Sequence, residues 1–125
     1  MKVFEVTLST KPMFKVHNYE KIDDVVCENK TGWCDSFNKY TSVEDFLDSL
    51  AKMAFLARRE FRETNEKGKY TYFAFIEGLG EFIQDENGWW KLFDNDSIDE
   101  FGMIEYFFDD DFDLEVDWGA TEKRN

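Results

Sequence analysis

A strict alternation of apolar and acidic residues is the feature that most constrains the fold. From residue 112 the chain reads FDLEVDW, so every second side chain is apolar up to Trp118. Successive side chains of an extended strand point to opposite faces of a sheet. This segment is therefore predicted to be a strand with one face toward a core. Its other face, with Asp113, Glu115 and Asp117, meets water or a basic partner.

Further strands are predicted at residues 3–8, 13–16, 70–77, 81–84, 89–93 and 103–108. The aromatic-rich run YTYFAFIE, residues 70–77, is typical of a central strand. Residues 81–84 and 89–93 flank the polar loop DENG, as the two arms of a hairpin do.

One long amphipathic helix is predicted from about Val43 to Glu63. Apolar residues recur there at three- and four-residue spacing. Ser42 with Asp45 resembles a capping box, although Asp replaces the usual Glu or Gln. The predicted last turns carry Arg58, Arg59 and Arg62. These arginines either complement the negative end of the helix dipole or form a basic patch for a partner.

The other segments give mixed signals. Residues 22–26, IDDVV, fit a helical turn or a strand, and residues 29–33, NKTGW, fit a turn. Asp96 or Ser97 is expected to cap a helical turn that ends near Gly102. The sum is an α+β fold: an antiparallel sheet of five to seven strands with one long helix packed on it. A length of 125 residues without a repeat or linker predicts a single domain, residues 1–125.

Charge is distributed unevenly along the chain. Residues 81–118 hold 14 acids and a single base, Lys91, whereas the remainder holds 14 acids and 14 bases. The whole net charge of −13 therefore comes from residues 81–118, the acidic sheet region. Crowded acids repel one another and oppose folding. Their concentration favours a partner of opposite sign, with chance clustering in an acidic protein as the alternative.

Composition argues against several classes of function. A net charge of −13 opposes direct binding of nucleic acid or anionic membranes. Cys27, Cys34 and His17 are too few and too scattered for a zinc site, and free thiols fit a reducing compartment. The first residues lack the continuous apolar run of a signal peptide. A cytoplasmic protein is therefore expected.

Residues 94–105 partly fit an EF-hand calcium loop. Asp94, Asp96 and Glu105 match its positions 1, 3 and 12, but Ile98 and Asp99 stand where a ligand and a glycine are required. The sequence shows no nucleophile–base motif and no phosphate-binding glycine loop. We therefore expect no metal, no cofactor and no enzymatic activity. A calcium-binding or enzymatic domain is the alternative of another class.

The charge layout of residues 81–118 resembles that of small acidic DNA-mimic proteins of bacteria and phages, without a shared motif. The resemblance implies a non-catalytic inhibitor that presents a phosphate-like carboxylate face to a basic DNA-binding protein and competes with DNA. Its partner would be a histone-like nucleoid protein, a restriction or CRISPR nuclease, or a repressor. The alternative is an immunity protein that neutralises a basic nuclease toxin.

The expected partner-binding residues are acids of the last predicted strand, of the turn before it, and of the 94–100 segment. They are Asp109, Asp110, Asp111, Asp113, Glu115, Asp117, Asp94, Asp96, Asp99 and Glu100. Adjacent strand residues point to opposite faces, so either Trp89 or Trp90 is expected in the core and the other exposed as an anchor. The alternative is that both faces of the sheet are covered, one by the long helix and one by a loop.

Overall fold

The computed structural model describes residues 3–4, 11–109 and 122–123. The chain divides into two compact units, residues 14–107 and residues 1–13 with 108–125. In the second unit β1 (Val3–Phe4) pairs antiparallel with β8 (Glu122–Lys123). The single domain expected over residues 1–125 stays a prediction.

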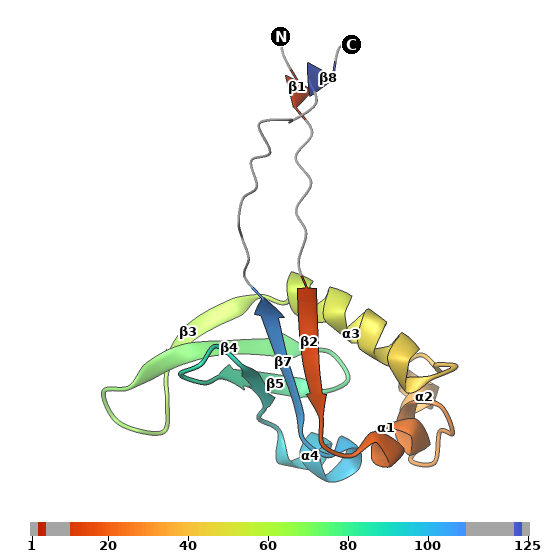
Figure 1. The fold of residues 1–125 in the computed structure, drawn as a ribbon. Coiled ribbons are helices and arrows are strands. Elements are labelled where there is room, and N and C mark those ends of the chain that lie inside the picture. Colours follow the sequence, from red (N-terminus) through yellow and green to blue (C-terminus); the bar gives the residue numbers. More distant parts are fainter. Residues whose placement is uncertain (1–2, 5–10, 110–121, 124–125) are drawn as a thin grey trace. The chain divides into compact units, whose positions relative to one another are not determined.

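A six-stranded antiparallel sheet is the largest element (Figure 1). Its strands follow the order β2-β7-β6-β5-β4-β3, which leaves β2 and β3 at its edges. The bounds are β2 Lys11–Val16, β3 Arg59–Glu63, β4 Tyr70–Ile76, β5 Gly80–Gln84, β6 Trp90–Leu92 and β7 Ile104–Asp109. The predicted α+β class, with five to seven strands in the sheet, is confirmed.

Four helices accompany the sheet: α1 (Tyr19–Val26), α2 (Trp33–Ser36), α3 (Val43–Leu56) and α4 (Asn95–Phe101). Side chains cap three of them, because Asn18, Ser42 and Asp94 accept hydrogen bonds from backbone N–H groups of the first turn. The segment IDDVV is thus helical. The cap of α4 is Asp94, so the expectation of Asp96 or Ser97 was wrong.

Helix α3 begins as predicted but ends seven residues earlier than Glu63, at Leu56. Ala57 is extended, with ψ 133°, and Arg59–Glu63 pairs with Tyr70–Ala74 as strand β3. Phe61 continues the helical spacing, but pairing with β4 prevails over that local pattern. Arg58, Arg59 and Arg62 therefore do not lie in the last turns of a helix, and the helix-dipole interpretation is wrong.

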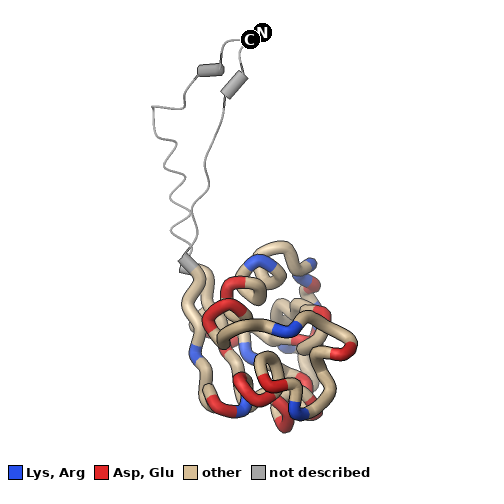
Figure 2. The backbone as a smooth tube through the Cα atoms, turned by 90° about the vertical axis from the view of Figure 1, so that its right-hand side faces the viewer, with Lys and Arg blue, Asp and Glu red and all other residues tan. Residues whose placement is uncertain are grey.

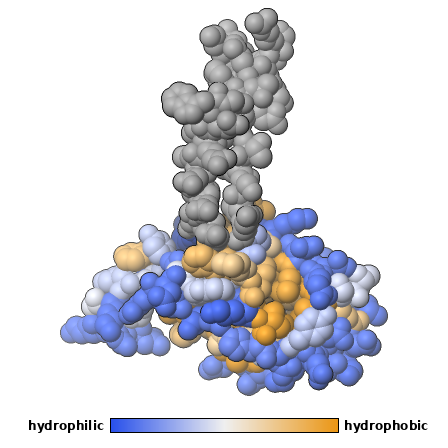
Figure 3. Space-filling view, viewed as in Figure 1, coloured by the Kyte–Doolittle hydropathy of each residue, from blue (hydrophilic) through white to orange (hydrophobic). Residues whose placement is uncertain are grey.

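The core lies between one face of the sheet and the helices. Phe82 and Leu92 are register partners on that face, and both are fully buried. From the helices, Phe46 stacks on Phe101 with ring centroids 6.2 Å apart. Each such side chain contributes roughly 1.5–3 kcal/mol by leaving water. Figure 3 shows further apolar surface around α3, whose last residue, Leu56, is exposed.

Candidate functional site

Four of the ten predicted partner-binding residues come together at helix α4. Asp94 immediately precedes the helix, and Asp96, Asp99 and Glu100 lie within it. Asp109 is the last residue of β7. The other five lie outside the described residues: Asp110, Asp111, Asp113, Glu115 and Asp117.

Asp94 differs from the other three acids because its carboxylate caps the start of helix α4. Its Oδ1 accepts a hydrogen bond of 3.1 Å from the backbone N–H of Ser97. The carboxylate also lies against the start of β5, where a Cβ added to Gly80 would be 2.6 Å from Asp94 Oδ2. Asp96, Asp99 and Glu100 are therefore the carboxylates that α4 presents, and we call them the α4 triad.

Helix α1 brings a second set of carboxylates beside α4 (Figure 1). The two helices are joined where Lys21 Nζ donates to the backbone oxygen of Asp99, at 3.0 Å. The set on α1 consists of Glu20, Asp23 and Asp24, and we call it the α1 triad. Both triads have the spacing i, i+3, i+4, so each lies along one side of its helix.

The α1 triad was not among the residues predicted from the sequence. The signal was present in part, because Asn18 is a suitable cap and Ile22, Val25 and Val26 form the buried side of the helix. Residues 18–40 nevertheless lie outside the acidic sheet region, and nothing local places them beside residues 94–101.

Few cations lie close to the triads. Lys30 Nζ is 2.9 Å from Asp24 Oδ1, and this hydrogen bond raises the pKa of Lys30. Asp24 is the one triad carboxylate that forms an ion pair within the described part of the chain. Figure 2 shows acidic positions on several sides of the body, so the triads are distinguished by their regular spacing rather than by being the only acids.

Several acids of the sheet and its loops lie beside cations. Glu81 forms an ion pair with Arg62, and Asp85 lies 3.6 Å from Lys91 Nζ. Glu105 is buried at 7% exposure, with Oε2 2.7 Å from His17 Nε2 and Oε1 3.6 Å from Lys91 Nζ. Glu63 of β3 is an exception, since its carboxylate accepts a hydrogen bond from the backbone N–H of Gly68. Of the six triad carboxylates, five form no ion pair within the described part of the chain.

The calcium-loop alternative has no support in the geometry of residues 94–105. These residues form α4 and the start of β7, and Glu105 is engaged by His17 and Lys91. Within residues 3–4, 11–109 and 122–123, no three His, Cys, Asp or Glu side chains are grouped to hold a metal ion.

The two cysteines are poor nucleophiles near neutral pH. Burial, with a hydrogen bond to Asp23 as the next cause, raises the pKa of the Cys27 thiol to about 11. Burial also raises the pKa of Cys34, whose Sγ donates to the backbone oxygen of Val25 at 3.2 Å. Because the thiolate is the reactive form, both residues are held in the unreactive thiol form. The expectation that the protein is not an enzyme stays a prediction.

Trp89 and Trp90 point to opposite sides, as their adjacency requires. Trp90 is buried and stacks on Tyr106, with ring centroids 5.9 Å apart. Trp89 is half-buried, stacks on Phe107, and has Lys15 Nζ 3.9 Å from its ring centroid. Trp90 is the core residue, and Trp89 is only partly accessible as an anchor.

Comparisons of this chain with protein-family models, with curated proteins and with solved structures gave no match. No helix among the described residues has the length and apolar character needed to cross a membrane.

Proposed function

We propose that this protein is a non-catalytic binding protein that presents the α1 and α4 triads to a basic nucleic-acid-binding protein and competes with nucleic acid. The partner class is the one expected from charge: a nucleoid protein, a nuclease or a repressor. The proposed surface keeps Asp96, Asp99 and Glu100 from that expectation and adds the α1 triad, while the expected residues 110–117 lie outside the described residues.

The regular spacing of carboxylates on neighbouring helices is the observation that supports this function. A helix rises about 1.5 Å per residue, so three charges from Glu20 to Asp24 span about 6 Å, with a mean axial separation of about 3 Å. One strand of B-DNA carries about one charge per 3.4 Å of its axis. Each triad therefore spaces its charges along the helix axis about as closely as one DNA strand does.

The chemistry of the surface also fits competition with phosphates. Carboxylates accept paired hydrogen bonds from arginine in the way that phosphates do. A DNA-binding surface already supplies arginine and lysine at phosphate spacing. Carboxylates on such a surface gain from its positive potential, which speeds association and makes it dependent on salt.

The test compares wild type with a variant of the α1 triad, Glu20→Gln, Asp23→Asn and Asp24→Asn. Proteins captured from source-cell extract are identified, and the purified partner is titrated with each form at several salt concentrations. We expect a nucleic-acid-binding partner that duplex DNA displaces. The variant should bind about tenfold more weakly, mainly through slower association, with a flatter dependence on salt.

The matched control removes three charges elsewhere, with Asp48→Asn, Glu77→Gln and Glu86→Gln, all exposed in wild type. It should bind nearly as tightly as wild type. The proposed function is wrong if the control weakens binding as much as the triad variant does. Simultaneous binding of DNA and this protein to the partner would also contradict it.

A further inference from the structure

We infer that two copies of this chain associate through strand β3, pairing antiparallel about a two-fold axis at Phe61 and joining their sheets into one. This association is independent of the proposed binding of a basic partner. It rests on three features of β3: an open edge, backbone groups directed outward, and a charge order that complements itself.

Strand β3 is an edge strand whose only protection within its own sequence is its charged side chains. Within the described residues β4 is its one neighbour in the sheet, and all five residues of β3 are exposed. Edge strands are normally blocked by proline, by bulges, by a covering segment or by charged side chains, and charges block only those partners whose charge order does not complement them. Here the register with β4 is regular across the strand, and the sequence Arg59–Glu63 contains neither proline nor glycine. Phe61 is 61% exposed at its centre.

The outward backbone groups belong to Arg59, Phe61 and Glu63. Just beyond the strand, the N–H of Thr64 donates to the oxygen of Lys69 at 2.7 Å. Residues whose N–H and C=O groups point toward the neighbouring strand alternate along an antiparallel pair. Arg62 and Glu60 therefore direct their groups toward β4. Arg59, Phe61 and Glu63 direct theirs away from β4, toward a side on which no described strand lies, and a second strand there would complete their hydrogen bonds.

The charge order of β3 selects one register. With Phe61 opposite its symmetry mate, Arg59 faces Glu63 of the second copy and Glu60 faces Arg62. Every charged residue of the strand then meets a charge of opposite sign, an arrangement that stabilises cross-strand pairs. The two Phe61 rings meet between the charged pairs, beside Tyr72, whose ring centroid is 5.0 Å from that of Phe61.

Neighbouring registers are disfavoured by the same rule. A two-fold axis at Glu60 or Arg62 would place that residue opposite its own copy, and like charges directly opposite are destabilising. An axis at Arg59 or Glu63 has the same fault. Phe61 is the one residue of the strand that meets its symmetry mate without charge repulsion.

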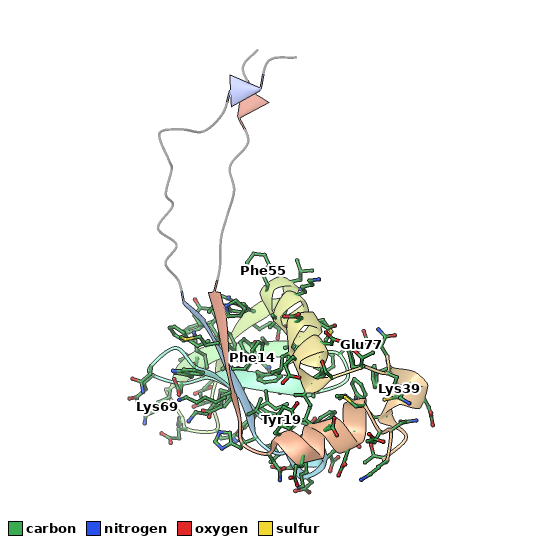
Figure 4. All side chains as sticks on the ribbon, turned by 45° about the vertical axis from the view of Figure 1, so that its right-hand side comes forward. Phe14, Tyr19, Lys39, Phe55, Lys69 and Glu77 are labelled. Carbon is green, nitrogen blue, oxygen red and sulfur yellow. The ribbon has the colours of Figure 1, made fainter. Side chains whose placement is uncertain are left out.

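The proposed dimer interface lies away from the α1 triad. Figure 1 shows β3 and α1 on opposite sides of β2 and β7. Figure 4 likewise shows Lys69, in the β3–β4 loop, and Lys39, beyond α2, at opposite ends of the body. A two-fold contact of this kind uses the same patch on both copies and closes on itself, so it gives a dimer and not a filament.

Sedimentation of the full chain over a range of concentrations tests the pairing. Wild type should form dimers. Arg59→Glu and Glu63→Arg should each raise the dissociation constant about tenfold or more, because each creates two like-charge pairs per dimer. The double variant reverses both partners and should return to within about threefold of wild type. Lys67→Glu, the same charge change in the exposed β3–β4 loop, should leave the dimer unaltered.

Cross-linking tests the register. Cα atoms of a hydrogen-bonded antiparallel pair lie about 5.5 Å apart, within the range that a disulfide spans. Phe61→Cys should therefore give a disulfide-linked dimer on oxidation, beyond any background from Cys27 and Cys34 in wild type. A wild-type chain that stays monomeric at about 1 mM overturns the inference. So does a double variant as weak as the single ones, or a Phe61→Cys variant that forms dimers but does not cross-link.

Discussion

Replacing Gly80 by alanine tests how closely strand β5 and helix α4 are coupled. Gly80 has φ +98°, and an added Cβ would lie 2.6 Å from Asp94 Oδ2. An L-residue in a left-handed conformation costs about 1–2 kcal/mol. The methyl group would also push Asp94 from its capping position, and loss of a cap costs about 0.5–2 kcal/mol. The free energy of unfolding should therefore fall by about 1.5–4 kcal/mol, measured by urea denaturation.

Gly68 offers a matched control for that experiment. It also has a positive φ, +84°, but an added Cβ would meet nothing within 4 Å. Gly68→Ala should therefore cost only the backbone part, about 1–2 kcal/mol. In an Asp94→Gly background the contact at residue 80 disappears, and Gly80→Ala should cost no more than Gly68→Ala. Equal losses for the two alanine variants in the wild-type background would refute the coupling between β5 and the α4 cap.

Four further predictions concern helix α3, the buried carboxylate, the net charge and the Cys27 thiol. Ser42→Ala should lower the free energy of unfolding by about 1 kcal/mol in urea, because Ser42 Oγ accepts from the N–H of Asp45 at 3.1 Å. Glu105→Gln should cost about 1–3 kcal/mol by weakening the hydrogen bond with His17 and removing the ion pair with Lys91, and an unchanged urea midpoint would contradict this. The melting temperature should rise with salt, since a net charge of −13 is screened, and it should rise less in the α1 triad variant. Folding raises the pKa of Cys27 from 9.0 to about 11, so the protonated thiol contributes to stability. This contribution is fully present below pH 9.0 and is lost as the pH rises through about 11. Denaturation at several pH values should show a smaller loss for Cys27→Ala in that window, and an identical loss would refute the role of the thiol.

Local signals in the sequence predicted most of the individual elements. Ser42 marks the start of α3, the DENG loop marks the β5–β6 hairpin, and the aromatic run over residues 70–77 marks β4. Caps, turns and strand periodicity act within a few residues, so they can be read without knowing the fold. The end of α3 is different: Phe61 fits helical spacing, and only pairing with β4 makes residues 59–63 a strand.

The candidate site likewise depends partly on local sequence and partly on long-range contacts. The sequence by itself determined the acidic character of the protein, the i, i+3, i+4 spacing of Asp96, Asp99 and Glu100, and an α+β fold with an antiparallel sheet. Only the tertiary structure decided that Glu20, Asp23 and Asp24 lie beside them, that Lys91 and His17 hold Glu105, and that β3 is an open edge. These outcomes depend on contacts between residues far apart in the chain, such as Lys21 with Asp99. Packing of apolar surfaces such as Ile22 and Phe101 selects those contacts, and no short stretch of sequence encodes which surfaces will meet.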